Sequence, residues 1–215
     1  MTPLAIRPYR PADRQAVHAI GADTAFFGDV VEAEMEDRRL FCDLFLAYYT
    51  DLEPQHAWVA CQDDRVTGFL LGCLDGKRQR RALLWRIVPQ VLGRLARRGY
   101  RLGRHTWRFA WSLVGAWIRR EVLPSFTACY PAHLHLNVAA PWRGRGIGRR
   151  LLDAYLSQLR ALAVPGVHLT TTSRNEAACR LYERSGFRLL EQRPTRIWAG
   201  LVDSPVQSRC YGLRL

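Results

Sequence analysis

The stretch that most constrains the fold is a glycine-rich turn between a strand-like run and a helix-like run. His133–Val138 alternates in the manner of a strand, and apolar residues recur with helical spacing from Arg149 to Ala163. Between them lies Arg143-Gly144-Arg145-Gly146-Ile147-Gly148. Backbone N–H groups of such a turn, and the first N–H groups of the helix, can face one anion, which glycines let approach closely. Two arginines add positive charge, so the stretch predicts a phosphate-binding site.

The glycine spacing separates this turn from two common nucleotide-binding loops. It is neither Gly-x-Gly-x-x-Gly, as in dinucleotide folds, nor Gly-x-x-x-x-Gly-Lys-Ser/Thr, as in NTPases. Taken alone, the glycines would indicate only a strand-to-helix turn. With its leading arginine, the pattern Arg-x-x-Gly-x-Gly after a strand resembles the pyrophosphate loop of the GNAT acetyltransferases.

A second stretch resembles the other signature of the same superfamily. It begins at Asn175, passes through two alanines to Tyr182 and ends at Gly186-Phe187, about 27 residues beyond the turn. Two motifs in the right order identify the chain as a member of the GNAT superfamily. The resemblance is close over residues 132–192 and general over residues 4–74.

A narrower resemblance lies at the entry to the strand before the turn. Tyr130-Pro-Ala-His-Leu-His-Leu-Asn-Val is similar to bacterial acetyltransferases related to the acetyltransferase-like domain of O-GlcNAc hydrolases. An aspartate commonly stands there where this chain has Asn137. Because an amide cannot act as a base, this departure speaks against a catalytic role for Asn137 and favours, as one alternative, a coenzyme A-binding protein with little activity.

The superfamily resemblance implies an α/β (α+β) fold. We expect a mixed central sheet of six to seven strands, splayed between the fourth and fifth strands and flanked by helices. The N-terminal pattern agrees with this order of a strand, two helices and a hairpin. The strands and helices expected from the pattern are strands at 4–8, 56–61, 66–73, 132–139, 167–172 and 187–192, a C-terminal hairpin of 196–202 with 210–215, and helices at 11–21, 38–49, 149–163 and from 173 or 175 onward.

The chain, 1–215, suits a single domain with a helical insertion at about 76–130. The insertion is far longer than an ordinary loop. Its first half carries an apolar stripe that includes Ile87 and Val91, with Pro89 as a kink, and its second half carries one that includes Trp107, Trp111 and Trp117. We expect an inserted basic helical pair whose apolar faces are covered.

The positive charge of the chain is concentrated in this insertion. The net charge is +13, and residues 76–120 hold thirteen Lys and Arg with no Asp or Glu. Helices packed on the domain body, with a solvated arginine face, are the first interpretation. A lid over the acceptor site or a homodimer contact follows, then peripheral membrane contact through residues 77–120. Nucleic-acid binding is last, because a basic face alone provides no readout of bases.

The resemblance also implies a cofactor and its site. Acetyl-CoA would lay its pantetheine arm between the parted strands, paired with the backbone of Leu136 and Val138. One N–H near Val138 would polarise the thioester carbonyl. The residues implied for cofactor binding are Leu136, Val138, Arg143, Gly144, Arg145, Gly146, Ile147, Gly148, Arg149, Asn175 and Tyr182.

Acetyl transfer to an amine needs a proton donor for the leaving sulfur and a proton acceptor for the amine. In the superfamily the tyrosine that matches Tyr182 is the usual acid, although a packing role remains its alternative. For the base, His135 titrates near neutral pH and Glu34 lies in the predicted acceptor wall, with Glu32 as a rival. His135 could equally be a core histidine, the glutamates could form a solvated face, and a water relay is a further alternative.

The sequence therefore predicts an acetyl-CoA-dependent N-acetyltransferase that acts on a small-molecule or peptide amine by direct attack in a ternary complex. The alternatives are a non-catalytic or regulatory acyl-CoA-binding module and a surface-binding protein that docks through the basic, Trp-rich insertion. The histidines and acids show no ligand spacing, so no metal is expected. Six scattered cysteines and the lack of a signal-peptide core predict a cytoplasmic protein.

Overall fold

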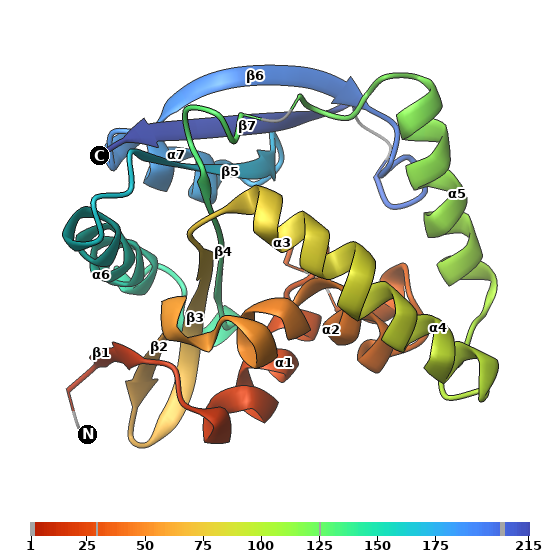
Figure 1. The fold of residues 1–215 in the computed structure, drawn as a ribbon, viewed down its shortest axis with the longest axis horizontal. Helices are drawn as coiled ribbons and strands as arrows, with labels where there is room; N and C mark the ends of the chain where they lie inside the picture. Colours follow the sequence, from red (N-terminus) through yellow and green to blue (C-terminus); the bar gives the residue numbers. More distant parts are fainter. Residues whose placement is uncertain (1–2, 29, 125, 203–204) are drawn as a thin grey trace.

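The computed structural model describes residues 3–28, 30–124, 126–202 and 205–215. Its centre is a seven-stranded mixed sheet in the order β1-β2-β3-β4-β5-β7-β6 (Figure 1). β4 and β5 run parallel, and all other neighbours run antiparallel, which confirms the predicted fold class. The strands are β1 (Ala5–Pro8), β2 (Ala57–Gln62), β3 (Arg65–Cys73), β4 (Ala132–Val138), β5 (Gly166–Thr172), β6 (Arg188–Thr195) and β7 (Val206–Arg214).

Helices cover both faces of the sheet. α1 and α2 share a buried cluster with one face, and α6 and α7 share a cluster with the other (Figure 1). The segment between β3 and β4 adds three more helices, of which α4 packs beside α2 and α5 stands at the edge of the molecule (Figure 1). The helices are α1 (Arg14–Asp23), α2 (Arg38–Phe45), α3 (Gly76–Ala82), α4 (Val88–Ala96), α5 (Arg104–Ile118), α6 (Ile147–Ala161) and α7 (Glu176–Arg184).

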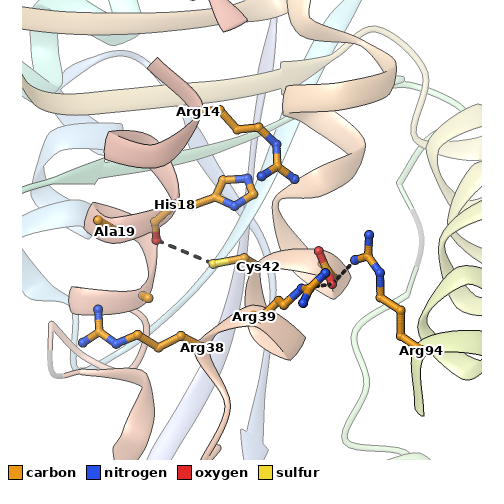
Figure 2. Close-up of a pocket in the computed structure, with 9 residues that line it drawn as sticks. Arg14, His18, Ala19, Arg38, Arg39, Cys42 and Arg94 are labelled. Atoms are coloured by element: carbon orange, nitrogen blue, oxygen red, sulfur yellow. Dashed lines mark hydrogen bonds and ion pairs between the residues drawn. The ribbon is translucent and has the colours of Figure 1, made fainter. Parts of the chain in front are cut away.

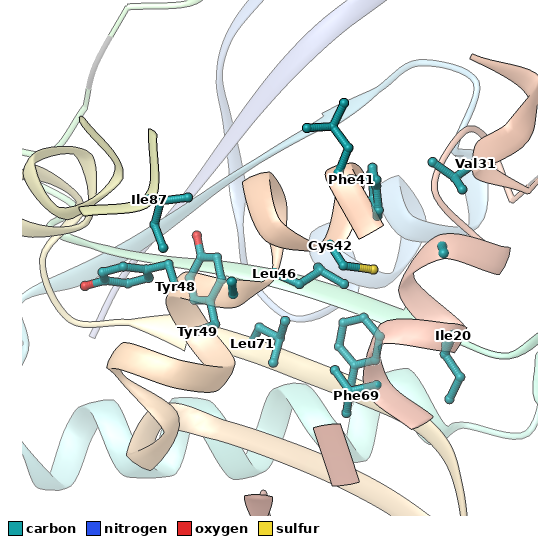
Figure 3. Packing of buried hydrophobic residues seen from close by; sticks show 14 of the residues in the cluster. Ile20, Val31, Phe41, Cys42, Leu46, Tyr48, Tyr49, Phe69, Leu71 and Ile87 are labelled. Atoms are coloured by element: carbon teal, nitrogen blue, oxygen red, sulfur yellow. The ribbon is translucent and has the colours of Figure 1, made fainter. Parts of the chain in front are cut away.

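The central strand β3 is buried on both faces. Phe69 and Leu71 point toward α1 and α2, where Tyr49 packs beside them (Figure 3). Leu70, between them in the sequence, belongs to the cluster under α6. This alternation explains the consecutive apolar residues Phe69-Leu70-Leu71, since a strand covered on both sides buries successive side chains on opposite faces.

Helix α6 lies close against β3. The hydroxyl of Tyr155 donates to the carbonyl of Cys73 at 2.9 Å. A Cβ added at Gly72 would stand 2.3 Å from the Tyr155 ring, so only glycine fits beneath that ring. This close packing anchors α6, and therefore the glycine-rich turn that precedes it, against the centre of the sheet.

The predicted helical pair is present. Its first arm consists of α3 and α4, which are joined by a π-helical turn at Leu83–Ile87. Pro89 follows in the first turn of α4, and because proline has no N–H it removes a helix hydrogen bond. The second arm is α5. The assignment of residues 76–130 as an insertion into a single domain stays a prediction.

Carboxylates in α2 and in the loop before it bind the two arms of the helical pair, which are α3–α4 and α5. The carboxylate of Glu36 accepts from the N–H groups of Gly103, His105 and Thr106 at 2.8–3.1 Å and so caps the start of α5. Asp43 pairs with Arg94 across the same junction. Glu36, in the loop before α2, and Asp43, within α2, therefore hold the starting end of α5 and helix α4 on the body.

Two expectations about these regions are wrong. The apolar stripe of α5 that includes Trp107, Trp111 and Trp117 faces outward, because α5 packs on the body through Phe109 and Ala116 instead. The C-terminal hairpin joins β6 to β7, and residues 196–202 form turns between them. Apolar spacing located the helix and the strands, but it could not say which side of α5 would be covered.

Replacing Glu36 with alanine should destabilise the protein by about 0.5–2 kcal/mol, the usual cost of a lost N-cap. Burial alone would raise the pKa of this carboxyl group, but the hydrogen bonds from Thr106 and the backbone lower it to about 2. The stabilisation should therefore be present above about pH 4.5 and decline as the pH falls toward 2. Urea unfolding of both proteins at pH 7 and pH 3 measures this; an equal difference at the two pH values would contradict it.

Candidate active site

The fourth and fifth strands separate soon after they meet. β4 and β5 pair only at Ala132 with Val167 and at His133 with His168, and across the described residues the two strands form no further pairs with each other. On its other side β4 stays paired with β3 along its whole length. The predicted splay between the fourth and fifth strands is therefore present.

Backbone groups of β4 face the resulting gap. The N–H of Ala139, just after β4, donates to the carbonyl of Thr67 on β3 at 2.9 Å. Because successive N–H groups along a strand alternate in direction, those of Leu136 and Val138 point away from β3 and into the gap. An extended chain lying there could pair with them as an added strand.

The glycine-rich turn opens beside this gap. Gly144 and Gly146 have φ of +76° and +74°, a region that glycine adopts without strain. α6 begins at Ile147, so the N–H groups of Ile147, Gly148 and Arg149 lack partners within the helix. A Cβ at Gly148 would lie 3.2 Å from Leu181, so this position approaches α7 closely. The turn thus presents a helix N-terminus suited to an anion.

The arginines of the turn are placed by neighbouring groups. Arg143 donates from Nε to the carbonyl of Val138 at 3.1 Å and so lies across the end of β4. The guanidinium of Arg145 lies over the ring of Trp142 at 4.8 Å. Arg149 pairs with Asp153 one helical turn on, at 2.8 Å. All three guanidinium groups remain exposed, which leaves donors for a ligand at the turn.

Two adjoining cavities occupy the gap and share part of their lining, including Leu136, Asn137 and Asn175. The larger, of about 400 Å³, reaches from β4 to the turn. The smaller, of about 210 Å³, is lined by His135 and Tyr182 among others. We call them the turn cavity and the inner cavity. Neither is lined by an Asp or Glu among the described residues.

Tyr182 and Asn175 reach the cavities from α7. Tyr182 is buried, with its ring 5.7 Å from that of Phe187, and burial raises the pKa of its phenol above the usual 10. The phenol is therefore protonated at neutral pH and available to donate its proton. Asn175 caps α7 by accepting from the N–H of Ala178 at 3.3 Å, which fixes its side chain at the wall of both cavities.

His135 belongs to a row of aromatic groups that crosses the base of the gap. Its ring lies 4.7 Å from that of His133 and 5.2 Å from that of Tyr49. His133 in turn lies 5.1 Å from His168 on β5. Burial lowers the pKa of His135 to about 4, so its imidazole is neutral at physiological pH.

Glu34, the other candidate base, and Asn137 both have partners within the chain. The buried carboxylate of Glu34 pairs with Arg108 of α5 and does not line either cavity. Asn137 lines both cavities, and its Nδ2 donates to the hydroxyl of Thr24 at 2.7 Å. The structure thus brings Tyr182 and His135 to one cavity and places Glu34 outside it.

Further lining residues were not anticipated. Phe27, Thr24 and Trp198 come from loops far from the motifs, and Thr170–Thr172 lines the inner cavity from β5. The threonine run was expected as a strand, and its alternation could have suggested which side chains face the gap. Nothing local in the sequence marks Trp198, because only the return of the chain after β6 brings it here.

Acidification should weaken the fold through the buried histidines. An unfolded histidine has a pKa near 6.5, whereas burial lowers that of His135, and of His18 on α1, to about 4. The unfolded state then binds more protons between pH 6.5 and pH 4, so stability falls as the pH drops through that window. Each such histidine contributes up to ~1.4 kcal/mol per pH unit. Urea titrations from pH 7 to pH 4.5 measure the slope, and His135→Gln should reduce it; an unchanged slope would count against this origin.

A further cavity of about 370 Å³ lies between α1, α2 and α4 (Figure 2). Four arginines line it, but carboxylates neutralise them. Arg14 pairs with Asp51 at 2.8 Å, and Arg94 and Arg39 both reach Asp43. Arg38 pairs with both Asp23 and Glu32. With its charge balanced, this cavity presents no excess of donors for an anion, unlike the turn cavity.

Comparisons with known proteins agree with this geometry. The acetyltransferase (GNAT) family model matches residues 115–187. The crystal structure of SsHAT is 31% identical and covers 99% of this chain and 98% of its own, with a TM-score of 0.74. The Salmonella typhimurium protein yncA, solved with its cofactor acetyl-CoA, has a TM-score of 0.60 at 17% identity and covers 100% of this chain and 95% of its own. That likeness concerns the fold.

Curated relatives match over a short segment. The mycothiol acetyltransferase of Nocardiopsis dassonvillei is 46% identical over 54 residues, which is 25% of this chain and 16% of that protein. The one from Propionibacterium freudenreichii is 38% identical over 55 residues, 26% of this chain and 18% of that protein. The match therefore spans less than a fifth of these relatives.

The narrower resemblance to bacterial acetyltransferases related to the acetyltransferase-like domain of O-GlcNAc hydrolases stays a prediction.

The parted strands, the turn at the start of α6, the family model and the full-length likeness to SsHAT agree with one another. On these grounds the chain belongs to the GNAT acetyltransferase family.

Proposed function

We propose that the protein is an acetyl-CoA-dependent N-acetyltransferase that acts on an amine of a small molecule or peptide. The observation that carries the proposal is the pair of adjoining cavities, one ending at a helix N-terminus and the other at Tyr182. The first suits an anionic, extended cofactor, and the second leaves room for an acceptor beside a proton donor. The expected cytoplasmic location and homodimer stay predictions.

The residues present fit acetyl-CoA. The N–H groups of Leu136 and Val138 would pair with the amides of its pantetheine arm, as in strand addition. Its pyrophosphate would be held by the N–H groups at the start of α6, with Arg143, Arg145 and Arg149 of the turn within reach of the anion. When bound, acetyl-CoA supplies the acetyl group as a thioester.

The chain's own groups would handle the protons. When the amine takes the acetyl group from the thioester, the phenol of Tyr182 would donate its proton to the leaving sulfur. An N–H of β4 near Val138 would stabilise charge on the acetyl oxygen. The acceptor amine would lose one proton and Tyr182 would regain one, so the protons balance over a turnover.

His135 is our proposal for the group that faces the amine. Its neutral imidazole can accept a hydrogen bond from an N–H of the acceptor and so orient the lone pair of the nitrogen. With a pKa of about 4 it is a weak base, so the proton would pass on to water rather than remain on the ring. Glu34 could join only through the opening of its pair with Arg108.

Thermal shift with acetyl-CoA tests cofactor use. A ligand at 100 times its Kd stabilises the native state by about 2.7 kcal/mol, so a concentration series should raise the Tm steadily. Release of free thiol from acetyl-CoA in the presence of an amine panel then tests transfer. An unchanged Tm at saturating acetyl-CoA would refute the proposal.

A non-catalytic acyl-CoA-binding module is the second candidate. It is favoured by the lack of a carboxylate at the described walls of either cavity and by the weak basicity of His135. It predicts the same rise in Tm with no thiol release for any amine. Although the matched relatives are named mycothiol acetyltransferases, the match of 54 residues is too short to carry their acceptor to this chain.

A further inference from the structure

The outward side of α5 is apolar from Trp107 to Ile118. Phe109 and Ala116 face the protein body, and the opposite side exposes Trp107 (55%), Trp111 (69%) and Trp117 (74%). The residues of this side recur with helical spacing, and we call them the tryptophan face: Trp107, Trp111, Val114, Trp117 and Ile118. α5 stands at the edge of the molecule, so this face is accessible (Figure 1).

Such a surface is unusual for a protein that meets only water. Scattered exposed apolar residues are normal, but a contiguous run of large ones marks a contact with another apolar surface. α5 is apolar on two opposite sides, and the described part of this chain covers one of them. The tryptophan face therefore requires an occupant from outside.

The charge of the helical segment that carries the face restricts that occupant. Residues 76–120 hold thirteen basic residues and no acidic one, while the rest of the chain is balanced. Among the described residues, Arg94, Arg108 and Arg119 pair with carboxylates, whereas the side chains of Arg86 and Arg104 form no ion pair. A partner that covers the face should therefore be negatively charged as well as apolar.

A second copy of the chain fits this requirement poorly. Two copies joined through α5 would bring two strongly basic segments together, which like-charge repulsion opposes. Single-stranded nucleic acid would match the charge and could stack on tryptophan, but Val114 and Ile118 offer no ring on which a base could stack. An anionic bilayer matches both features, because its interface accepts tryptophan and aliphatic side chains while its headgroups attract arginine.

We propose that the protein docks on anionic phospholipid membranes through the tryptophan face. α5 would lie in the plane of the interface, with Arg101 and Arg104 at its start near the lipid headgroups. No described helix is long and apolar enough to cross a membrane. Docking through one charged and apolar side of a helix should be weakened by salt, which screens the attraction between arginine and the headgroups.

Docking would place the inner cavity next to the bilayer. Phe109, on the inner side of α5, packs against Phe26 at 5.5 Å and Trp198 at 5.9 Å. Phe26 and Trp198 both line the inner cavity. The lipid-facing side and the cavity side are thus opposite sides of one helix. The inference does not depend on catalysis, so the two can fail separately.

Co-sedimentation with vesicles tests the proposal. The full-length protein should pellet with phosphatidylserine/phosphatidylcholine vesicles at low salt, and much less with phosphatidylcholine alone or at high salt. Trp111→Ser/Trp117→Ser should reduce the partition coefficient at least about tenfold through the loss of two interfacial anchors. Arg101→Gln/Arg104→Gln should reduce it about 25-fold, since ~1 kcal/mol per basic residue is about fivefold.

Two control variants change an exposed apolar residue and an exposed arginine outside α5. Leu162→Ser, at an exposed apolar residue after α6, and Arg65→Gln, at the start of β3, should leave partitioning unchanged. An unchanged Tm shows that the tryptophan variant folds. Equal pelleting with neutral and anionic vesicles, or none with either, would overturn the proposal. So would a dimer in sedimentation equilibrium, or a complex with single-stranded nucleic acid, that the tryptophan variant disrupts while vesicle binding is unaffected.

Discussion

Replacing Tyr182 with phenylalanine should lower kcat by roughly 100-fold to 10,000-fold, the range of a general acid. The ring would stay in place beside Phe187 at the wall of the inner cavity, and only the hydroxyl would be lost. Because burial raises the pKa of this phenol, it stays protonated across the usual assay range, and the loss should be similar at every pH from about 6 to 9. Steady-state thiol release measures kcat, and calorimetry measures acetyl-CoA affinity, which should change little.

A second buried tyrosine provides the control. Tyr9 is buried, its hydroxyl has no hydrogen-bond partner among the described residues, and it lines neither cavity. Tyr9→Phe removes the same atom without touching the site, so kcat should stay at the wild-type level. If Tyr182→Phe retained full kcat, Tyr182 would be a packing residue and another proton donor would be needed.

Replacing Gly148 with leucine should weaken acetyl-CoA binding by about 5-fold to 150-fold, the equivalent of 1–3 kcal/mol of overpacking. A Cβ at this position already lies 3.2 Å from Leu181 and 3.4 Å from Leu136, so the rest of a leucine side chain must turn into the turn cavity. There it would cover the N–H groups at the start of α6. Titration calorimetry measures the affinity directly.

Gly93 offers the matched substitution. It lies in α4, is exposed, and a Cβ there meets no atom within 4 Å. Gly93→Leu therefore adds the same side chain to a helix without blocking a cavity, and acetyl-CoA affinity should not change. Wild-type affinity in Gly148→Leu, with an intact fold by circular dichroism, would place the cofactor away from this turn.

Local sequence was sufficient wherever a motif and its function lie on adjacent residues. The turn, the strand before it and the helix after it are consecutive, so their geometry follows from glycine at Gly144 and Gly146 and from apolar spacing in α6. Asn175 and Tyr182 likewise share one helix, and both line the gap. The parting of β4 and β5 came from the family resemblance, since no residue pattern specifies it.

Local sequence does not reveal contacts between residues that are far apart along the chain. The pairing of Glu34 with Arg108 joins residues 74 positions apart, and it occupies a carboxylate that looked available for proton transfer. His135 looked titratable near neutral pH, but burial between Tyr49 and His133 keeps it neutral well below that range. Both outcomes depend on what surrounds a side chain, which a local pattern does not contain.

By itself, then, the sequence determined the order of the strands and helices as far as β6, the position of the glycine-rich turn and the family. These features depend on the backbone conformation of short segments and on the periodicity of apolar residues, and neighbouring residues in the sequence determine both. Only the tertiary structure decided which side of α5 is buried, because both sides are apolar and the choice was made by Phe26 and Trp198 packing on Phe109. That choice left the tryptophans facing outward.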